Sequence, residues 1–159
     1  MTRPAARPPW FDPAPPSPED CVLKSMLEVR AERHPQRLVA SFEDGSTWTY
    51  GECLDRVRSA AAGLQSLGVA KGDRVLAWLP SGMPMLLTWF ASNYLGAVFV
   101  PLNTAYRGRI LEHVVNNAAG AVMVAHHELV PRLHGLELQH LRHVITVGGS
   151  AAPGPGFRL

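Results

Sequence analysis

The sequence is poor in cysteine and has no uninterrupted apolar run near its amino end. Its 159 residues include two cysteines, Cys21 and Cys53, both within helical patterns. Two thiols cannot form the disulfide framework of a small secreted domain, and their spacing does not suit a metal site. Prolines occupy the amino-terminal stretch where a secretory signal needs about 7 to 15 apolar residues. We therefore expect a cytoplasmic chain without structural disulfides.

A strong excess of charge of one sign is also lacking. The chain has 15 Lys and Arg against 13 Asp and Glu, which gives a formal net charge of +2. The basic residues are scattered and do not form the patch that nucleic-acid binding requires. A hydrophobic content of 47% with 18% charged residues is typical of a globular domain. We expect no nucleic-acid partner, and either one domain or part of a larger one.

Charged residues and histidines are absent from the stretch between Val75 and Tyr106, so a membrane span is one interpretation. A span needs about 20 mainly apolar residues without a break. Prolines, glycines and an asparagine interrupt this stretch at intervals that suit a buried strand, a buried helix and a second buried strand. The interrupting residues are Pro80, Gly82, Pro84, Asn93, Gly96 and Pro101. This punctuation favours a globular core, and we expect no membrane span.

The amino-terminal residues are rich in proline, which lacks a backbone donor, and they predict a disordered arm over residues 1–16. Order is expected to begin at Ser17, a suitable N-cap before Pro18 and two acidic residues that complement the helix dipole. The helix should continue to about His34 and stop at Pro35. Its expected stripe consists of Leu23, Met26, Leu27 and Arg30.

A β-hairpin and a capped helix are predicted next. The strand-like runs 38–42 and 46–50 are separated by a turn that contains an Asp-Gly pair, a strong hairpin signal. Thr49 and Glu52 then match the capping box, in which each side chain satisfies a backbone donor at a helix start. Apolar residues follow at spacings of three and four, and Gly68 suits the left-handed end of the helix. They are Cys53, Val57, Ala60, Leu64 and Leu67.

From residue 75 onward, strand-like and helix-like segments alternate. The strand-like segments are 75–79, 97–100, 121–125 and 144–147, and the helix-like segments are 83–95, 107–118 and 127–133. The strands are unbroken apolar runs, which is typical of strands covered on both faces. They predict an α/β fold, in which a mostly parallel sheet with flanking helices follows the short hairpin. We expect this domain to cover residues 17–147, followed by a Gly/Pro-rich tail over residues 148–159.

No catalytic motif is present. Gly149 and Gly154 in the tail have the interval of a phosphate-binding P-loop, but Pro155 takes the position of the required lysine. Of the five histidines near the carboxyl end, only His140 and His143 have a spacing that one helix could use for a metal ion. We therefore expect no metal site, and the motifs predict no catalytic residue.

Three stretches nevertheless carry a resemblance to a known family. They are Thr49-Tyr50-Gly51-Glu52, Leu67-Gly68-Val69 through Lys71-Gly72-Asp73-Arg74-Val75, and Gly96-Ala97-Val98 through Val100-Pro101-Leu102-Asn103. In this order and spacing they resemble the N-terminal portion of the adenylate-forming (AMP-binding) enzymes, and within that superfamily they are most like acyl-CoA synthetases. The likeness extends from about residue 20 to Val147. Ser81 departs from the pattern, because many members have Asn after the Leu-Pro pair.

The resemblance implies an ATP-dependent ligase reaction in two halves. A carboxylate attacks the α-phosphate of ATP to give an acyl-adenylate, and coenzyme A (CoA) then displaces AMP. This activation requires Mg²⁺ and basic groups that neutralise phosphate charge. In this family the phosphate loop, the nucleotide pocket and the catalytic lysine lie downstream of the matching region. We therefore expect residues 1–159 to be inactive alone, with no catalytic residue and no strong binding of ATP, Mg²⁺ or CoA.

The resemblance also suggests a contact with CoA. In some synthetases, basic residues just after the Pro-Leu-Asn stretch contact the CoA phosphates, and Arg107 and Arg109 match that neighbourhood. A guanidinium binds phosphate through paired hydrogen bonds. The alternative is that both arginines are solvated charges in the first turn of a helix.

A second hypothesis is a non-catalytic interaction module, or one half of a split enzyme whose other half is a separate chain. A parallel sheet that is cut partway exposes an edge strand and apolar faces. We therefore expect residues 1–159 alone to self-associate, or to pair with the part of the enzyme that carries the remaining functions.

Overall fold

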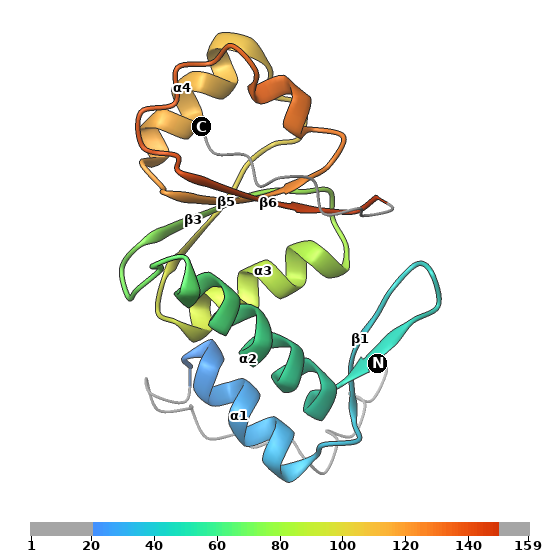
Figure 1. Cartoon of the computed structure of the whole chain (residues 1–159). Coiled ribbons are helices and arrows are strands. Elements are labelled where there is room, and N and C mark those ends of the chain that lie inside the picture. Colours follow the sequence, from blue (N-terminus) through green and yellow to red (C-terminus); the bar gives the residue numbers. More distant parts are fainter. Residues whose placement is uncertain (1–20, 150–159) are drawn as a thin grey trace, which may run out of the picture.

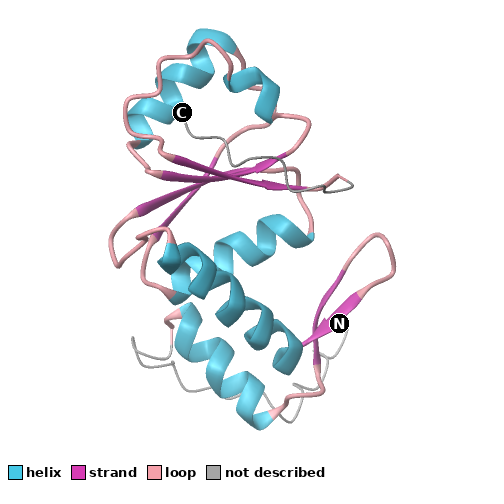
Figure 2. Cartoon of the chain, in the orientation of Figure 1, coloured by secondary structure: helices cyan, strands magenta, loops and turns pink. Residues whose placement is uncertain are grey.

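A computed structural model describes residues 21–149 (Figure 1). Its elements are α1 Leu23–Arg33, β1 Leu38–Ser41, β2 Thr47–Thr49, α2 Tyr50–Ser66, β3 Arg74–Trp78, α3 Met83–Tyr94, β4 Val98–Pro101, α4 Gly108–Ala118, β5 Val122–His126, the 3₁₀ helix η1 Val130–Leu133 and β6 His143–Val147. A four-stranded sheet lies between helical layers, and a two-stranded hairpin lies to one side (Figure 2). The predicted arm over residues 1–16, and the tail from residue 150 onward, lie outside the described residues.

All neighbouring strands of the larger sheet run parallel, in the order β4-β3-β5-β6. The chain passes from β3 through α3 to β4, and then returns through α4 to β5 on the other side of β3. Right-handed crossovers in opposite directions place their helices on opposite faces. Accordingly, α4 lies above the sheet and α3 below it in Figure 1. The predicted α/β fold with a parallel sheet, flanking helices and a preceding hairpin is confirmed.

The central strands are buried on both faces, because successive side chains of a strand point to opposite sides. Val75 and Ala77 of β3 belong to an apolar core shared with α2 and α3. Leu76 and Trp78 belong to a second core, with Leu111 of α4. This arrangement explains why β3 has an unbroken apolar sequence. The outer strands β4 and β6 are only partly buried.

The hairpin and the start of α2 form as their local sequence predicts. β1 pairs antiparallel with β2, and Gly45 in the turn has a φ of +82°, which glycine adopts at little cost. At the start of α2, the Glu52 N–H donates to Thr49 Oγ1 at 3.3 Å, and the Thr49 N–H donates to Glu52 Oε2 at 2.9 Å. The predicted capping box is confirmed. Gly68 follows α2 with a φ of +88°, as predicted.

The start of the first helix differs from the prediction. α1 begins at Leu23, with Val22 at the N-cap and no side-chain capping bond, and Cys21 lies in a turn before it. The prediction of one continuous helix from Ser17 is therefore wrong at Cys21 and Val22, and Ser17 itself lies outside the described residues. A capping sequence is only a local signal, and most of the stability of a helix comes from tertiary packing.

The buried face of α1 also differs from the predicted stripe. Leu27 and Ala31 are buried, whereas Met26 is 46% exposed. Leu27 and Ala31 are four residues apart, so they lie on one face of the helix. They share an apolar core with residues of β2 and α2. Contact with these elements sets the rotation of α1 more strongly than its own apolar pattern does.

The helix predicted over residues 127–133 forms only as η1, Val130–Leu133. Pro131 lies within this segment and has no backbone N–H to donate, which disfavours a longer α-helix. The chain then continues through a loop to β6. This loop brings Leu141 into the core on the α4 face.

The uncharged stretch from Val75 to Tyr106 forms β3, α3, β4 and the start of the following loop. The prediction of a buried strand, a helix and a second strand is confirmed in its order, although β4 is only half-buried. Within residues 21–149, no helix combines the length and the apolar character that crossing a membrane requires.

Candidate functional site

The candidate site lies at the carboxyl edge of the parallel sheet. Ligands of such sheets bind where connections from neighbouring strands leave toward opposite faces. After β3 the chain turns to α3 below the sheet, and after β5 it turns to η1 on the α4 side. The connections after β3 and β5 therefore leave the sheet toward opposite faces. The loops around this place are 79–82, 102–107 and 127–129.

The loop after β4, residues 102–107, is held by hydrogen bonds at this edge. The Leu102 N–H donates to a carbonyl of β3 at 2.8 Å. The indole N–H of Trp78 donates to the Asn103 carbonyl at 3.1 Å. The Asn103 side chain accepts a hydrogen bond from the Ala105 N–H at 2.9 Å, which closes a tight turn. The loop therefore leads to α4 along a defined path.

Arg107 and Arg109, the two residues predicted to contact CoA, lie at the amino end of α4. Arg107 is the N-cap, with an extended backbone, and Arg109 lies in the first turn. Both are exposed, and neither guanidinium has a hydrogen bond or ion pair with another residue of the described range. The unpaired N–H groups of a first helical turn add positive potential there. This helix end can therefore attract an anion such as phosphate.

The two arginines lie on either side of Gly108 at the start of α4. Arg107 is the N-cap, with an extended backbone, and Arg109 lies within the first turn. A ligand with more than one phosphate, placed across the amino end of the helix, could contact both.

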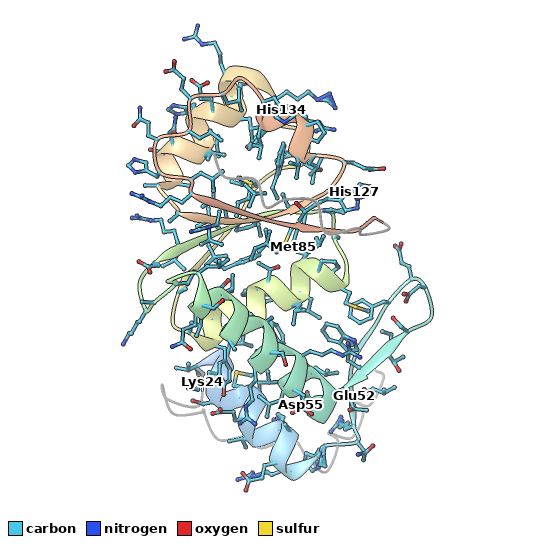
Figure 3. The ribbon with its side chains drawn as sticks, in the orientation of Figure 1. Lys24, Glu52, Asp55, Met85, His127 and His134 are labelled. Atoms are coloured by element: carbon cyan, nitrogen blue, oxygen red, sulfur yellow. The ribbon has the colours of Figure 1, made fainter. Side chains whose placement is uncertain are left out.

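Two histidines lie at the end of β5, where Figure 3 labels His127. The rings of His126 and His127 have centroids 4.5 Å apart. Gly148, after β6, has a φ of +74°, and a Cβ on it would lie 2.6 Å from His126 Nε2. His126 Nδ1 is 3.7 Å from the Glu128 carboxylate. Glycine at position 148 therefore lets the chain after β6 pass close to the imidazoles.

Metal-ligating side chains are not gathered at this edge. In residues 21–149, no group of three or more His, Cys, Asp or Glu side chains is arranged to hold a metal ion. His140 and His143, the pair with suitable spacing, are exposed and flank the buried Leu141 near the start of β6. They therefore lie at the amino edge of the sheet, opposite the candidate site.

The cysteines also lie away from the site. Cys53 is buried in α2, and burial raises the pKa of its thiol, which keeps the thiol protonated near neutral pH. A protonated buried thiol is a poor nucleophile. Cys21 is exposed in the turn before α1.

Sequence patterns did not single out two residues that shape this edge, Trp78 and Arg132. Arg132 of η1 donates from Nη1 to the Thr104 carbonyl at 2.7 Å, and its Cζ lies 6.0 Å from the centroid of the Trp78 ring. Arg132 and Thr104 are 28 residues apart in sequence. Local motifs indicate contacts between residues that are close in sequence. The contact between Arg132 and Thr104 is therefore visible only in the folded structure.

Comparisons with known proteins agree with this architecture. Residues 27–155 match the family model of the AMP-binding enzymes. The mitochondrial medium-chain acyl-CoA ligase ACSF2 of Pongo abelii is 30% identical over 152 aligned residues, covering 84% of this chain and 25% of that protein. Feruloyl-CoA synthase of an Amycolatopsis species is 36% identical over 96 residues, covering 60% of this chain and 20% of that protein.

A solved structure shows the same arrangement of elements. The long-chain-fatty-acid-CoA ligase FadD1 from Archaeoglobus fulgidus has a TM-score of 0.72 and 25% identity, over 81% of this chain and 28% of that chain. This chain thus spans about a quarter of the length of that ACSF2 protein and of FadD1. Because the family match covers far more than half of its residues, the chain belongs to the AMP-binding enzyme family and corresponds to the N-terminal portion of an adenylate-forming acyl-CoA synthetase.

Proposed function

We propose that this chain serves as the N-terminal portion of an ATP-dependent acyl-CoA ligase, which converts a carboxylic acid, ATP and CoA into acyl-CoA, AMP and pyrophosphate. The match to AMP-binding enzymes over residues 27–155 carries the proposal. The relatives support it, because one is named as an acyl-CoA ligase and another as a feruloyl-CoA synthase.

In this function, Arg107 and Arg109 contact the phosphates of CoA. Both side chains are exposed at the amino end of α4, where the helix adds positive potential. The preceding loop is fixed by hydrogen bonds with β3. A site that is ordered before binding loses less conformational entropy when its ligand arrives. CoA carries several phosphates, so the two arginines can bind different ones.

The described loops at the carboxyl edge of the sheet offer few ligands for Mg²⁺. Protein sites hold Mg²⁺ through one or two carboxylates together with substrate phosphates. At the carboxyl edge of the sheet, the loops 79–82, 102–107 and 127–129 contain one carboxylate, Glu128, which is exposed and lies beside His126. We therefore assign no residue to ATP or Mg²⁺, and the proposal includes no formation of acyl-adenylate by residues 1–159 alone.

Calorimetric titration of the purified chain with CoA tests the role of the arginine pair. We expect weak, saturable binding that the double substitution Arg107→Ala with Arg109→Ala weakens further, by about tenfold or more, since each charged hydrogen bond contributes about 1.5 to 3 kcal/mol. Arg142→Ala is the matched control, because Arg142 is exposed at the opposite edge of the sheet. Equal affinity in the wild type and the double variant would assign both arginines to ordinary surface charge.

An interaction module, or one half of a split enzyme, is the second candidate function. Apolar side chains exposed on α3 and on the edge strand β4 favour it: Trp89 is 44% exposed and Val98 is 49% exposed. The neighbouring coding sequence separates the interaction module from the ligase and from the split enzyme. A Ser/Thr/Gly-rich loop that ends in Pro-Lys-Gly would support the ligase or a split enzyme, whereas an unrelated sequence would support the module.

We also propose a cytoplasmic location for this chain. The free thiols of both cysteines support this proposal.

A further inference from the structure

Two side chains from separate elements hold consecutive carbonyls of the loop that leads to α4. Trp78, at the end of β3, is fully buried, and its indole N–H donates to the Asn103 carbonyl at 3.1 Å. Arg132, on η1, donates to the Thr104 carbonyl at 2.7 Å. The Arg132 guanidinium also lies over the Trp78 ring, with Cζ 6.0 Å from the ring centroid. The two donors therefore support each other as well as the loop.

This pair of contacts fixes the turn immediately before Arg107. Beyond the held carbonyls, the Ala105 N–H donates to Asn103 Oδ1 at 2.9 Å, and the Tyr106 N–H donates to the Asn103 carbonyl at 3.1 Å. Both amides depend on the orientation of Asn103. Since Arg107 follows Tyr106 directly, the direction in which α4 presents its first arginine depends on this turn.

We propose that Arg132 is a positioning residue for the CoA-binding arginines, which it serves by holding the loop through Thr104. The inference rests on the proposed function of Arg107 and Arg109. Arg132 is suited to this task because a planar guanidinium can donate to a carbonyl while it stacks on an aromatic face. Arg132 holds the loop through its hydrogen bond to the Thr104 carbonyl. The positive charge of its guanidinium helps to keep the side chain over the Trp78 ring.

Hydrogen exchange in the full chain tests the positioning without any ligand. We expect Arg132→Leu, which removes the donor, to speed exchange at the Ala105 and Tyr106 amides by about tenfold, as loss of one charged hydrogen bond predicts. Arg132→Gln retains an amide donor and should restore much of the protection. Arg142→Leu should leave both amides as in the wild type. Unchanged exchange at both amides in Arg132→Leu would overturn the inference.

CoA affinity of the same variants then links the loop to the site. We expect Arg132→Leu to bind CoA several-fold more weakly, and Arg132→Gln to recover most of the affinity. Equal weakening by Leu and Gln, with exchange unchanged, would mean that the charge of Arg132 acts directly and would overturn positioning. Faster exchange at the Ala105 and Tyr106 amides in Arg132→Leu, with CoA affinity unchanged, would also overturn the inference. The variant that lacks both Arg107 and Arg109 tests the proposed function separately, because wild-type affinity there would refute that function whatever the exchange rates show.

Discussion

The phenolic hydroxyl of Tyr94 donates a hydrogen bond to Glu28 Oε1 at 2.7 Å and so joins the end of α3 to α1. Arg58 of α2 donates from Nε to the same hydroxyl at 3.1 Å, and its Nη2 lies 3.5 Å from Glu28. Lys24, labelled on α1 in Figure 3, places its Nζ 4.7 Å from the centroid of the Tyr94 ring. One tyrosine therefore connects the three helices on this side of the sheet.

Removal of the Tyr94 hydroxyl should destabilise the fold. We expect Tyr94→Phe to lower the free energy of unfolding by about 1 kcal/mol, because the lost bond has a charged acceptor that solvent partly screens. Urea denaturation followed by circular dichroism measures this change. Tyr106→Phe is the control, since the Tyr106 hydroxyl has no hydrogen bond to another residue in the range 21–149. An equal effect of both substitutions would contradict the role given to the Tyr94 hydroxyl.

The same contact predicts a dependence on pH. The hydrogen bond from Tyr94 lowers the pKa of the Glu28 carboxyl below its ordinary value of 4.5, and the positive charges of Lys24 and Arg58 act in the same direction. A lowered folded-state pKa stabilises the protein above the unfolded-state pKa, and this stabilisation is lost as the pH falls through the folded-state value. Glu28→Gln should therefore reduce the unfolding free energy more at about pH 7 than at about pH 3. A difference that stays constant over this range would exclude the linkage.

The capping box at the start of α2 should contribute measurably to stability. We expect Thr49→Ala to cost about 1 kcal/mol, because it leaves the Glu52 N–H without its acceptor. Thr47→Ala on the same strand is the matched control, because Thr47 is exposed and lies outside the box. Urea denaturation of both variants gives the comparison, and equal costs would mean that the measured loss reflects strand propensity instead.

Local signals in the sequence predicted the elements whose causes are themselves local. The turn at Gly45 and the box at Thr49 and Glu52 are set by residues within a few positions of one another, and all are present in the structure. The unbroken apolar run of β3 correctly indicated a strand with two covered faces. The alternating order of strand-like and helix-like segments, together with the right-handedness of crossovers, was sufficient to predict a parallel sheet.

Features that depend on distant contacts were not predicted. The exposure of Met26 follows from how α1 packs, which its own pattern does not contain. The bond between Tyr94 and Glu28 spans 66 residues, and the bond between Arg132 and Thr104 spans 28. The proposed contact of Arg107 and Arg109 with CoA was predicted from the family resemblance, and the structure places both residues at the amino end of α4.

Isotope exchange between pyrophosphate and ATP tests the central claim most directly. The purified chain is incubated with ATP, Mg²⁺ and a panel of carboxylic acids, with a full-length acyl-CoA ligase as the positive control. If residues 1–159 form the N-terminal portion of a ligase whose ATP-binding parts lie elsewhere, no acid should support exchange above the level without enzyme. Robust exchange by this chain, reproducible with independently purified protein, would contradict the account.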